Sequence, residues 1–172
     1  LRCLVGSEMC IRDRSSAFSS CDKLRQYENG IYYVDGWVVG ADSNIVKAII
    51  KEGTRGIADY AFYGCSSLTS ITIPDSVTNI EGFVFTDTPW LTAKQEENPL
   101  VILNGTLIDG TTCTGSVTIP DGVTSIAGGA FDSCTGLTAI AIPKSVTSIG
   151  DSAFYRCTSL TEITIPDSVT SM

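Results

Sequence analysis

The chain has 172 residues, of which 43% are hydrophobic and 17% are charged, and its formal net charge of −8 opposes nonspecific binding to nucleic acid or anionic lipid. It contains no histidine, which excludes His-based catalytic triads, imidazole proton shuttles and His-ligated metal sites. Its apolar runs are too short to cross a bilayer, so the composition predicts a soluble, non-catalytic chain without a cofactor or metal.

Residues 1–16 do not share the pattern of the rest of the chain. Their basic residues follow the apolar ones, and no long apolar segment precedes a small-residue cleavage site, so a signal peptide is not predicted. The run from Glu8 to Asp13 resembles a translated sequencing adapter. We therefore expect residues 1–16 to be artefactual or disordered, and we leave them out of the fold prediction.

One sequence motif is repeated through residues 17–172. The segment from Ala61 to Ile80 returns almost intact as Ala130 to Ile149, and Phe131 and Phe154 lie 23 positions apart. A fixed period of about 20 to 50 residues is typical of a solenoid, and about 20 to 29 is the range of leucine-rich repeats. Because the chain enters and leaves in the middle of a repeat, we expect a single solenoid fragment that is truncated at both ends.

Two dipeptides predict β-hairpins within this series. Asp35-Gly36 separates two β-rich runs in residues 27–40, and Asn104-Gly105 does the same in residues 100–108. Such dipeptides favour the two-residue turns that join antiparallel strands. The two turns lie 69 positions apart, which is three repeat periods. The hairpins are therefore spaced by a whole number of repeats.

The coil between the two hairpins cannot follow the regular path. Lys94 and Glu96 occupy positions where other repeats have isoleucine, and a charged side chain does not enter an apolar core unpaired. Thr88 and Pro89 form a helix start signal, and Asn98-Pro99 forms a stop signal. We therefore predict a short helix in this coil.

The regular unit predicts a half-buried strand. Leu68, Ile71 and Ile73 fall on one face of an extended segment, while Ser70 and Thr72 fall on the other. Proline then ends the strand because it has no N–H donor.

This unit resembles that of the BspA-like leucine-rich repeat family, which reads roughly Leu-x-x-Ile-x-Ile-Pro-x-x-Val-x-x-Ile-x-x-x-Ala-Phe-x-x-Cys. The resemblance implies a right-handed, β-rich repeat solenoid with parallel strands and short helical turns, into which the two hairpins are inserted. It also implies a role in adhesion or partner binding at a bacterial or protist cell surface, without shared catalytic residues. The matching positions are Leu68, Ile71, Ile73, Pro74, Val77, Ile80, Leu137, Ile140, Ile142, Pro143, Val146, Ile149, Ala153, Phe154 and Cys157.

The seven cysteines follow the repeat more than any metal-binding pattern. No Cys-x-x-Cys pair is present, so a zinc ribbon is not predicted. We expect buried free thiols at the shared repeat position, and a bridge between Cys134 and Cys157 remains an alternative. Cys113 is out of register and could be exposed, while Cys3 and Cys10 belong to residues 1–16. The shared repeat position is held by Cys21, Cys65, Cys134 and Cys157.

Two groups of residues are candidates for partner binding. The first is the ribbon of outward strand positions, where solenoids commonly bind, although small polar residues also simply suit an exposed strand. The second is the set of aromatic residues in or beside the irregular coils, which either anchor a partner or cover a hairpin. The ribbon contains Lys47, Ile49, Ser70, Thr72, Ser116, Thr118, Ala139, Ala141, Glu162 and Thr164, and the aromatic residues are Tyr32, Tyr33, Trp37 and Trp90.

These observations lead to two hypotheses about function. The first is an extracellular or cell-surface module that binds a protein or a glycan on another cell or in the matrix. The alternative is a structural spacer or stalk of a larger surface protein, with no ligand site of its own. Nucleic acid and membrane insertion are not expected in either case.

Overall fold

The computed structural model describes residues 26–171. The expectations for residues 1–16, for the start of the repeats at residue 17, and for Cys3, Cys10 and Cys21 lie outside the described residues. The chain divides into two compact units, Leu1–Leu91 and Thr92–Met172. In the described part of the chain, no helix is both long and apolar enough to cross a membrane.

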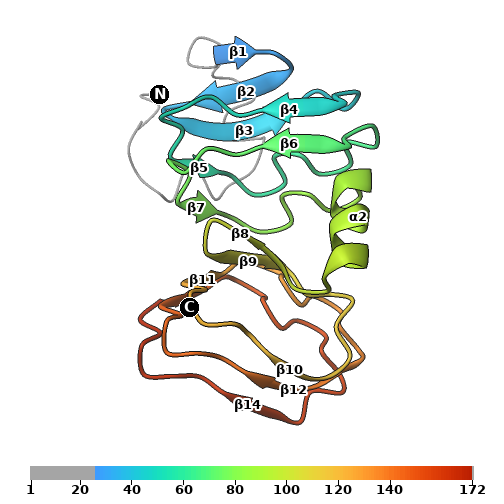
Figure 1. Cartoon of the computed structure of the whole chain (residues 1–172), viewed down its shortest axis with the longest axis vertical. Helices are drawn as coiled ribbons and strands as arrows, with labels where there is room; N and C mark the ends of the chain where they lie inside the picture. The colour runs from blue at the N-terminus through green and yellow to red at the C-terminus, as the bar shows by residue number, and fades with distance from the viewer. Residues whose placement is uncertain (1–25, 172) are drawn as a thin grey trace, which may run out of the picture. The chain divides into compact units, whose positions relative to one another are not determined.

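The first unit is built from short strands in two sheets (Figure 1). One sheet has the strand order β1-β2-β3-β5-β7, and the other pairs β4 with β6. The β4–β6 pairing is parallel and joins Lys47 to Ser70, which are one period apart. The repeat period is therefore the length of one coil. The strands are β1 (Gln26–Glu28), β2 (Ile31–Val34), β3 (Trp37–Ala41), β4 (Lys47–Ile49), β5 (Gly56–Ile57), β6 (Ser70–Thr72) and β7 (Asn79–Ile80).

Two hairpins open the described part of this unit. The predicted turn at Asp35-Gly36 joins the antiparallel strands β2 and β3, and its φ values of 47° and 77° are those of a type I′ turn. Asn29-Gly30 joins β1 to β2 with φ values of 51° and 83°. The first hairpin confirms the prediction. The β1–β2 hairpin was not predicted, although Asn29-Gly30 is the same kind of turn-forming dipeptide.

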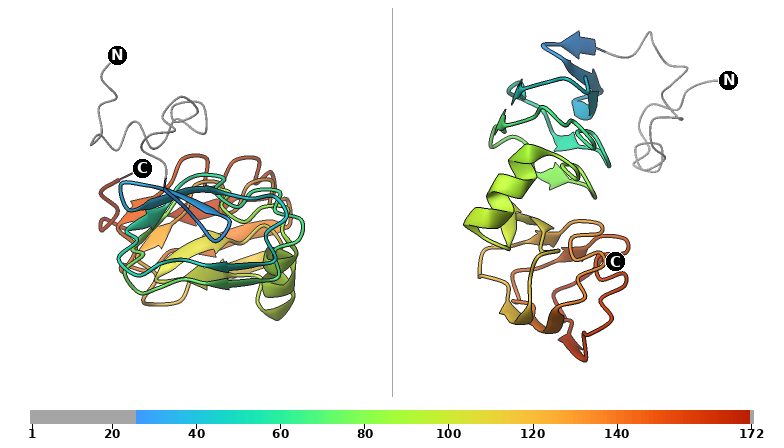
Figure 2. Two further views of the ribbon diagram at one scale, coloured as in Figure 1. Left: turned by 90° about the horizontal axis from the view of Figure 1, so that it is seen from above. Right: turned by 90° about the vertical axis from the view of Figure 1, so that its right-hand side faces the viewer.

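The predicted helix is present as α2 (Pro89–Glu97), which Figure 2 shows as a coiled ribbon. The boundary between the two units falls within its residues. Thr88 Oγ1 accepts a hydrogen bond from Leu91 N at 3.2 Å, as expected of an N-cap. Lys94 Nζ lies 2.7 Å from Glu97 Oε2 on the solvent side. The departure of this coil from the regular strand path is therefore confirmed.

The second unit contains the other hairpin and the most regular coils. Asn104-Gly105 joins β8 to β9 with φ values of 46° and 76°, as predicted. Two parallel ladders follow, β10-β12-β14 and β9-β11-β13. Together these sheets confirm a parallel-strand solenoid as the fold class. The strands are β8 (Val101–Leu103), β9 (Thr106–Asp109), β10 (Gly115–Thr118), β11 (Ser125–Ile126), β12 (Leu137–Ala141), β13 (Ser148–Ile149) and β14 (Glu162–Thr164).

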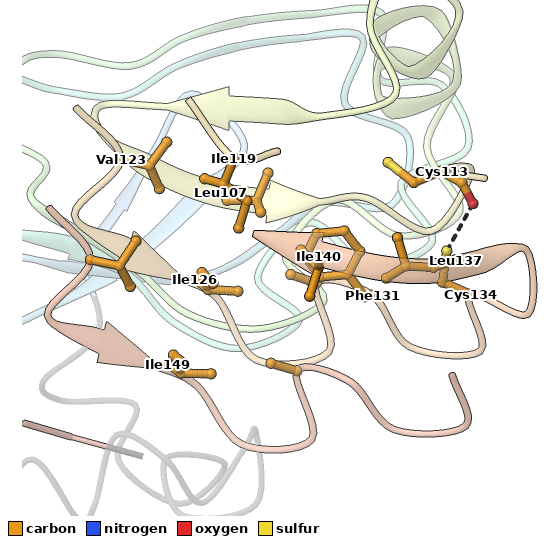
Figure 3. Packing of buried hydrophobic residues seen from close by; sticks show 13 residues of the cluster. Leu107, Cys113, Ile119, Val123, Ile126, Phe131, Cys134, Leu137, Ile140 and Ile149 are labelled. Atoms are coloured by element: carbon orange, nitrogen blue, oxygen red, sulfur yellow. Dashed lines mark hydrogen bonds between the residues drawn. The ribbon is translucent and has the colours of Figure 1, made fainter. Parts of the chain in front are cut away.

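The core of the second unit is a cluster of buried aliphatic and aromatic residues with two cysteines, contributed by successive coils (Figure 3). Leu107, Phe131 and Leu137 are completely buried at its centre. Phe131 stacks on Phe154, with ring centroids 5.2 Å apart. Each coil therefore buries the apolar residues that the preceding coil would otherwise expose.

Turn backbones also recur with the period of the repeat. Tyr60 and Phe83 of the first unit have φ values of 59° and 54°, in the left-handed region. The same repeat position in the second unit holds Gly129 and Ser152, with φ values of 64° and 57°. The left-handed turn is thus a property of the coil, whichever side chain occupies it.

Candidate functional site

The outward strand face of the first unit is formed by β4 and β6. Lys47 pairs with Ser70, and Ile49 pairs with Thr72, and all four residues are exposed. Ala48, which lies between the two β4 residues, is completely buried. The predicted alternation of inward and outward residues is therefore correct on these strands.

Exposed apolar side chains distinguish this face. Ile49 is 53% exposed, and Val46, which precedes β4, is 58% exposed. The equivalent of Ile49 in the second unit, three periods later, is Thr118. An isolated exposed apolar residue is ordinary, but here two of them lie close in sequence to a lysine, in or just before β4.

The equivalent face of the second unit is more polar and more regular. Its three parallel strands place small or polar residues side by side, with Glu162 as the one charged residue among the paired outward positions. All the outward residues are exposed except Ala139, which is half-buried. The ribbon predicted from sequence is thus solvent-facing here too. Its paired positions are Ser116 with Ala139 and Glu162, and Thr118 with Ala141 and Thr164.

Two tyrosines of the first hairpins, Tyr27 and Tyr32, both bind the carboxylate of Asp42, a contact that the sequence did not predict. Tyr32 Oη donates to Asp42 Oδ1 at 2.9 Å, and Tyr27 Oη donates to Asp42 Oδ2 at 2.7 Å. The Tyr27 and Tyr32 rings lie 5.1 Å apart. The hydrogen bond to Asp42 raises the pKa of the exposed Tyr27 hydroxyl. Tyr27 is therefore a further aromatic residue at this surface. It was not predicted because the Asn29-Gly30 turn, which pairs its strand β1 with β2, was not recognised.

Two of the predicted aromatic anchors are core residues. Tyr33 is 2% exposed and its hydroxyl accepts a hydrogen bond from Lys51 N, and burial raises its pKa. Trp90 is 7% exposed, and its ring lies 4.6 Å from that of Phe85. Their burial leaves little surface for a partner, which corrects the expectation that both could serve as exposed anchors.

Trp37 is less buried than Tyr33 and Trp90. It is half-buried, and its ring covers Gly56 so closely that a Cβ atom added there would lie 2.5 Å from a ring carbon. Gly56 therefore has to be glycine to admit the indole. Tyr32 and Trp37 retain some accessible surface, and they remain the two predicted aromatic residues that a partner could touch.

The cysteines of the repeat are free thiols inside the coils. Cys134 Sγ donates to Cys113 O at 3.1 Å, and Cys157 Sγ donates to Phe131 O at 3.0 Å. Cys65, Cys113, Cys134 and Cys157 are all unbridged. The expectation of buried free thiols at the shared repeat position holds for Cys65 and Cys134, whereas Cys157 is half-buried.

Cys113 differs from the prediction. It is 3% exposed, so the suggestion of an exposed thiol was wrong. Burial raises the pKa of its thiol to about 11. Within residues 26–171, no three His, Cys, Asp or Glu side chains are placed to hold a metal ion together.

Comparison with known proteins gives a family match over most of the chain. A sequence model of the family described as "BspA type Leucine rich repeat region" matches residues 40–101 and 108–172 in six copies. A search of curated proteins found no match.

Several solved structures resemble this chain. A leucine-rich repeat protein from Eubacterium ventriosum is 17% identical, with a TM-score of 0.43, over 88% of this chain and 48% of that one. A leucine rich cell surface protein from Faecalibacterium prausnitzii is 28% identical, with a TM-score of 0.49, over 81% of this chain and 38% of that one. A leucine-rich repeat protein from Bacteroides ovatus is 21% identical, with a TM-score of 0.36, over 85% of this chain and 45% of that one. The chain thus spans less than half the length of these three proteins.

Proposed function

Since this chain belongs to the BspA-type leucine-rich repeat family, we propose that it is a non-catalytic interaction module, outside the cell or on its surface, that binds a protein or a glycan. The acidic net charge of −8 supports a partner other than nucleic acid or anionic lipid. The absence of histidine from the sequence supports a binding role over the common hydrolytic chemistries.

The observation that carries this proposal is the exposed strand face of the first unit. Parallel strands hold its side chains at fixed positions, so little conformational entropy is lost when a partner binds. Ile49 and Val46 supply apolar area there, and Lys47 supplies a charge that favours an acidic patch on a partner. Apolar contacts at the centre of an interface with polar residues around them are typical of protein–protein binding.

The test is a binding screen with matched variants. The full chain is applied to panels of purified extracellular-matrix proteins and of immobilised glycans. The double substitution Val46→Thr with Ile49→Thr keeps the strand-forming shape and removes apolar area. We expect it to weaken binding about tenfold or more, which corresponds to about 1.4 kcal/mol.

The control is Tyr155→Ala, which removes an equally exposed apolar side chain from a turn. It should leave binding to a strand-face partner unchanged. If the chain binds nothing on either panel, the result contradicts the proposal and favours the alternative of a structural spacer. Equal losses in both variants would show that the strand face is not the binding surface.

A further inference from the structure

Three aromatic rings meet in the turns that follow β5 and β7 of the first unit. Tyr60 stacks on Phe83 with ring centroids 5.2 Å apart and an interplanar angle of 17°. Tyr63 meets Tyr60 edge-on at 5.6 Å. Tyr63 is 50% exposed, and the other two are half-buried. We call these three residues the aromatic platform.

The backbone does not require aromatic residues at these positions. Tyr60 and Phe83 adopt left-handed φ values, where a bulky residue costs about 1–3 kcal/mol. Gly129 and Ser152 occupy the same turn in the second unit, and glycine adopts this conformation freely. Stacking of one aromatic pair returns only about 0.5–1.5 kcal/mol. The turn itself therefore does not require aromatic residues, which favours a role for the rings beyond the fold.

A carboxylate lies beside the platform. Asp87 raises the pKa of Tyr63, through hydrogen bonding and its negative charge. A carboxylate has about four acceptor positions, so Asp87 can accept further hydrogen bonds. The equivalent of Asp87 in the second unit is Arg156, which has the opposite charge. The combination of rings and a carboxylate is thus specific to the first unit.

Contact between the rings decides what kind of ligand fits. Centroid separations of 5.2 and 5.6 Å place the rings in direct contact. No space remains between them for an enclosed ammonium group, so they offer ring surfaces and not a cage. An anionic ligand would be repelled by the carboxylate, and a purely apolar one would bury it unpaired. A ring-shaped ligand with apolar C–H faces can pack on the aromatic rings, and its hydroxyl groups can donate hydrogen bonds to the carboxylate of Asp87.

We propose that Tyr60, Tyr63 and Phe83 form a binding site for a neutral saccharide, whose pyranose ring packs on the exposed aromatic surface while its hydroxyls donate to Asp87. The site is separate from the strand face of β4 and β6. It goes beyond the proposed function, because it narrows the glycan to a neutral saccharide and assigns it to residues outside the strand face.

The test uses immobilised neutral oligomers of glucose, of mannose and of N-acetylglucosamine, followed by calorimetry in solution on the full chain. We expect at least one of them to bind. Tyr63→Ala should lower the affinity at least tenfold, and the double substitution Tyr60→Gly with Phe83→Ser should abolish measurable binding. Because glycine and serine already occupy this turn in the second unit, the double variant is expected to fold, and Tyr63→Ala alters only an exposed side chain.

The control is Tyr155→Ala, which removes a comparably exposed tyrosine from the second unit and should leave saccharide binding unchanged. Binding should also be nearly independent of salt, because the ligand is uncharged. The inference is overturned if no neutral oligomer binds, if the folded double variant binds as well as the unaltered chain, or if only choline binds. Loss of protein binding in the strand-face variant, with saccharide binding intact, would separate this site from that of the proposed function.

Discussion

Asp109 is a buried carboxylate that connects helix and sheet residues of the second unit. It accepts a hydrogen bond from Gln95 Nε2 at 2.8 Å and one from Thr111 Oγ1 at 3.1 Å. Burial raises its pKa, and the hydrogen bonds from Gln95 and Thr111 offset this only in part, so the pKa of Asp109 lies above that of an exposed aspartate. The neighbouring titratable groups are the thiols of Cys113 and Cys134, whose own pKa values burial raises.

A substitution at Asp109 tests this balance. Because the pKa is higher in the folded chain, the stability of the unaltered protein should fall as pH rises through that pKa. Asp109→Asn retains the shape and the acceptor for Gln95 without the buried charge. We expect it to be more stable than the unaltered chain at pH 7, with the difference shrinking toward pH 4, as measured by urea unfolding.

The control at this position is Asp109→Ala, which leaves the hydrogen-bonding groups of Gln95 and Thr111 without their acceptor. It should lower the free energy of unfolding by about 1–3 kcal/mol. An Asn variant that is less stable at pH 7, or a difference that does not change with pH, would contradict the interpretation.

The glycine that follows β13 lies directly against the backbone of the adjacent coil. Gly150 N donates to Ile126 O at 2.8 Å, one coil away. A Cβ atom at Gly150 would lie 2.4 Å from Gly128 N and 2.8 Å from Ala127 C. Because these are backbone atoms, they cannot rotate away as a side chain could. The spacing of adjacent coils is thus limited by the lack of a side chain here.

Gly150→Ala should therefore force adjacent coils of the second unit apart. We expect it to destabilise the chain by about 1–3 kcal/mol, the usual cost of overpacking, as measured by chemical denaturation. Gly40→Ala in β3 is the matched control, because its nearest neighbour is a Tyr32 ring carbon at an ordinary 3.8 Å. That change should stay within about 0.5 kcal/mol. Equal effects from both substitutions would rule out close coil contact as the cause.

At the scale of the whole molecule, the cysteine position of the repeat makes the same thiol-to-carbonyl contact in both units. Cys65 Sγ donates to Asp42 O at 3.6 Å, and Cys134 Sγ donates to Gly110 O at 3.4 Å. Each thiol thus satisfies a carbonyl group roughly one coil earlier in the chain. Burial raises the pKa of Cys65, Cys134 and Cys157, which disfavours the reactive thiolate.

Thiol labelling of the native chain tests this arrangement. With iodoacetamide and mass mapping of peptides, we expect Cys65, Cys113 and Cys134 to remain unmodified, because burial disfavours the thiolate. Cys157 should react first among the four described cysteines, since it is half-buried. All four should react after unfolding in urea. Rapid labelling of Cys113, or a Cys134–Cys157 peptide joined by a disulfide, would contradict it.

The sequence alone determined the features that are encoded within one repeat or one turn. The period of 23 residues specified parallel pairing of equivalent residues, such as Ser125 with Ser148. Asp35-Gly36 specified a hairpin, and Thr88 specified the start of α2. Each of these depends on local backbone preference or on regular repetition, so neighbouring residues contain the whole signal.

Only the tertiary structure decided which side chains of the irregular coils are accessible. Trp90 is buried because the helix turns it onto Phe85, and Cys113 is buried because the coil after the β8–β9 hairpin turns it inward. The spacing of Tyr60 and Phe83 follows the repeat, but only the structure shows that their rings stack and that Tyr63 is half exposed beside them. Where a hairpin or helix interrupts the repeat, counting positions no longer predicts the direction of a side chain. Burial there depends on contacts between segments that are distant in sequence.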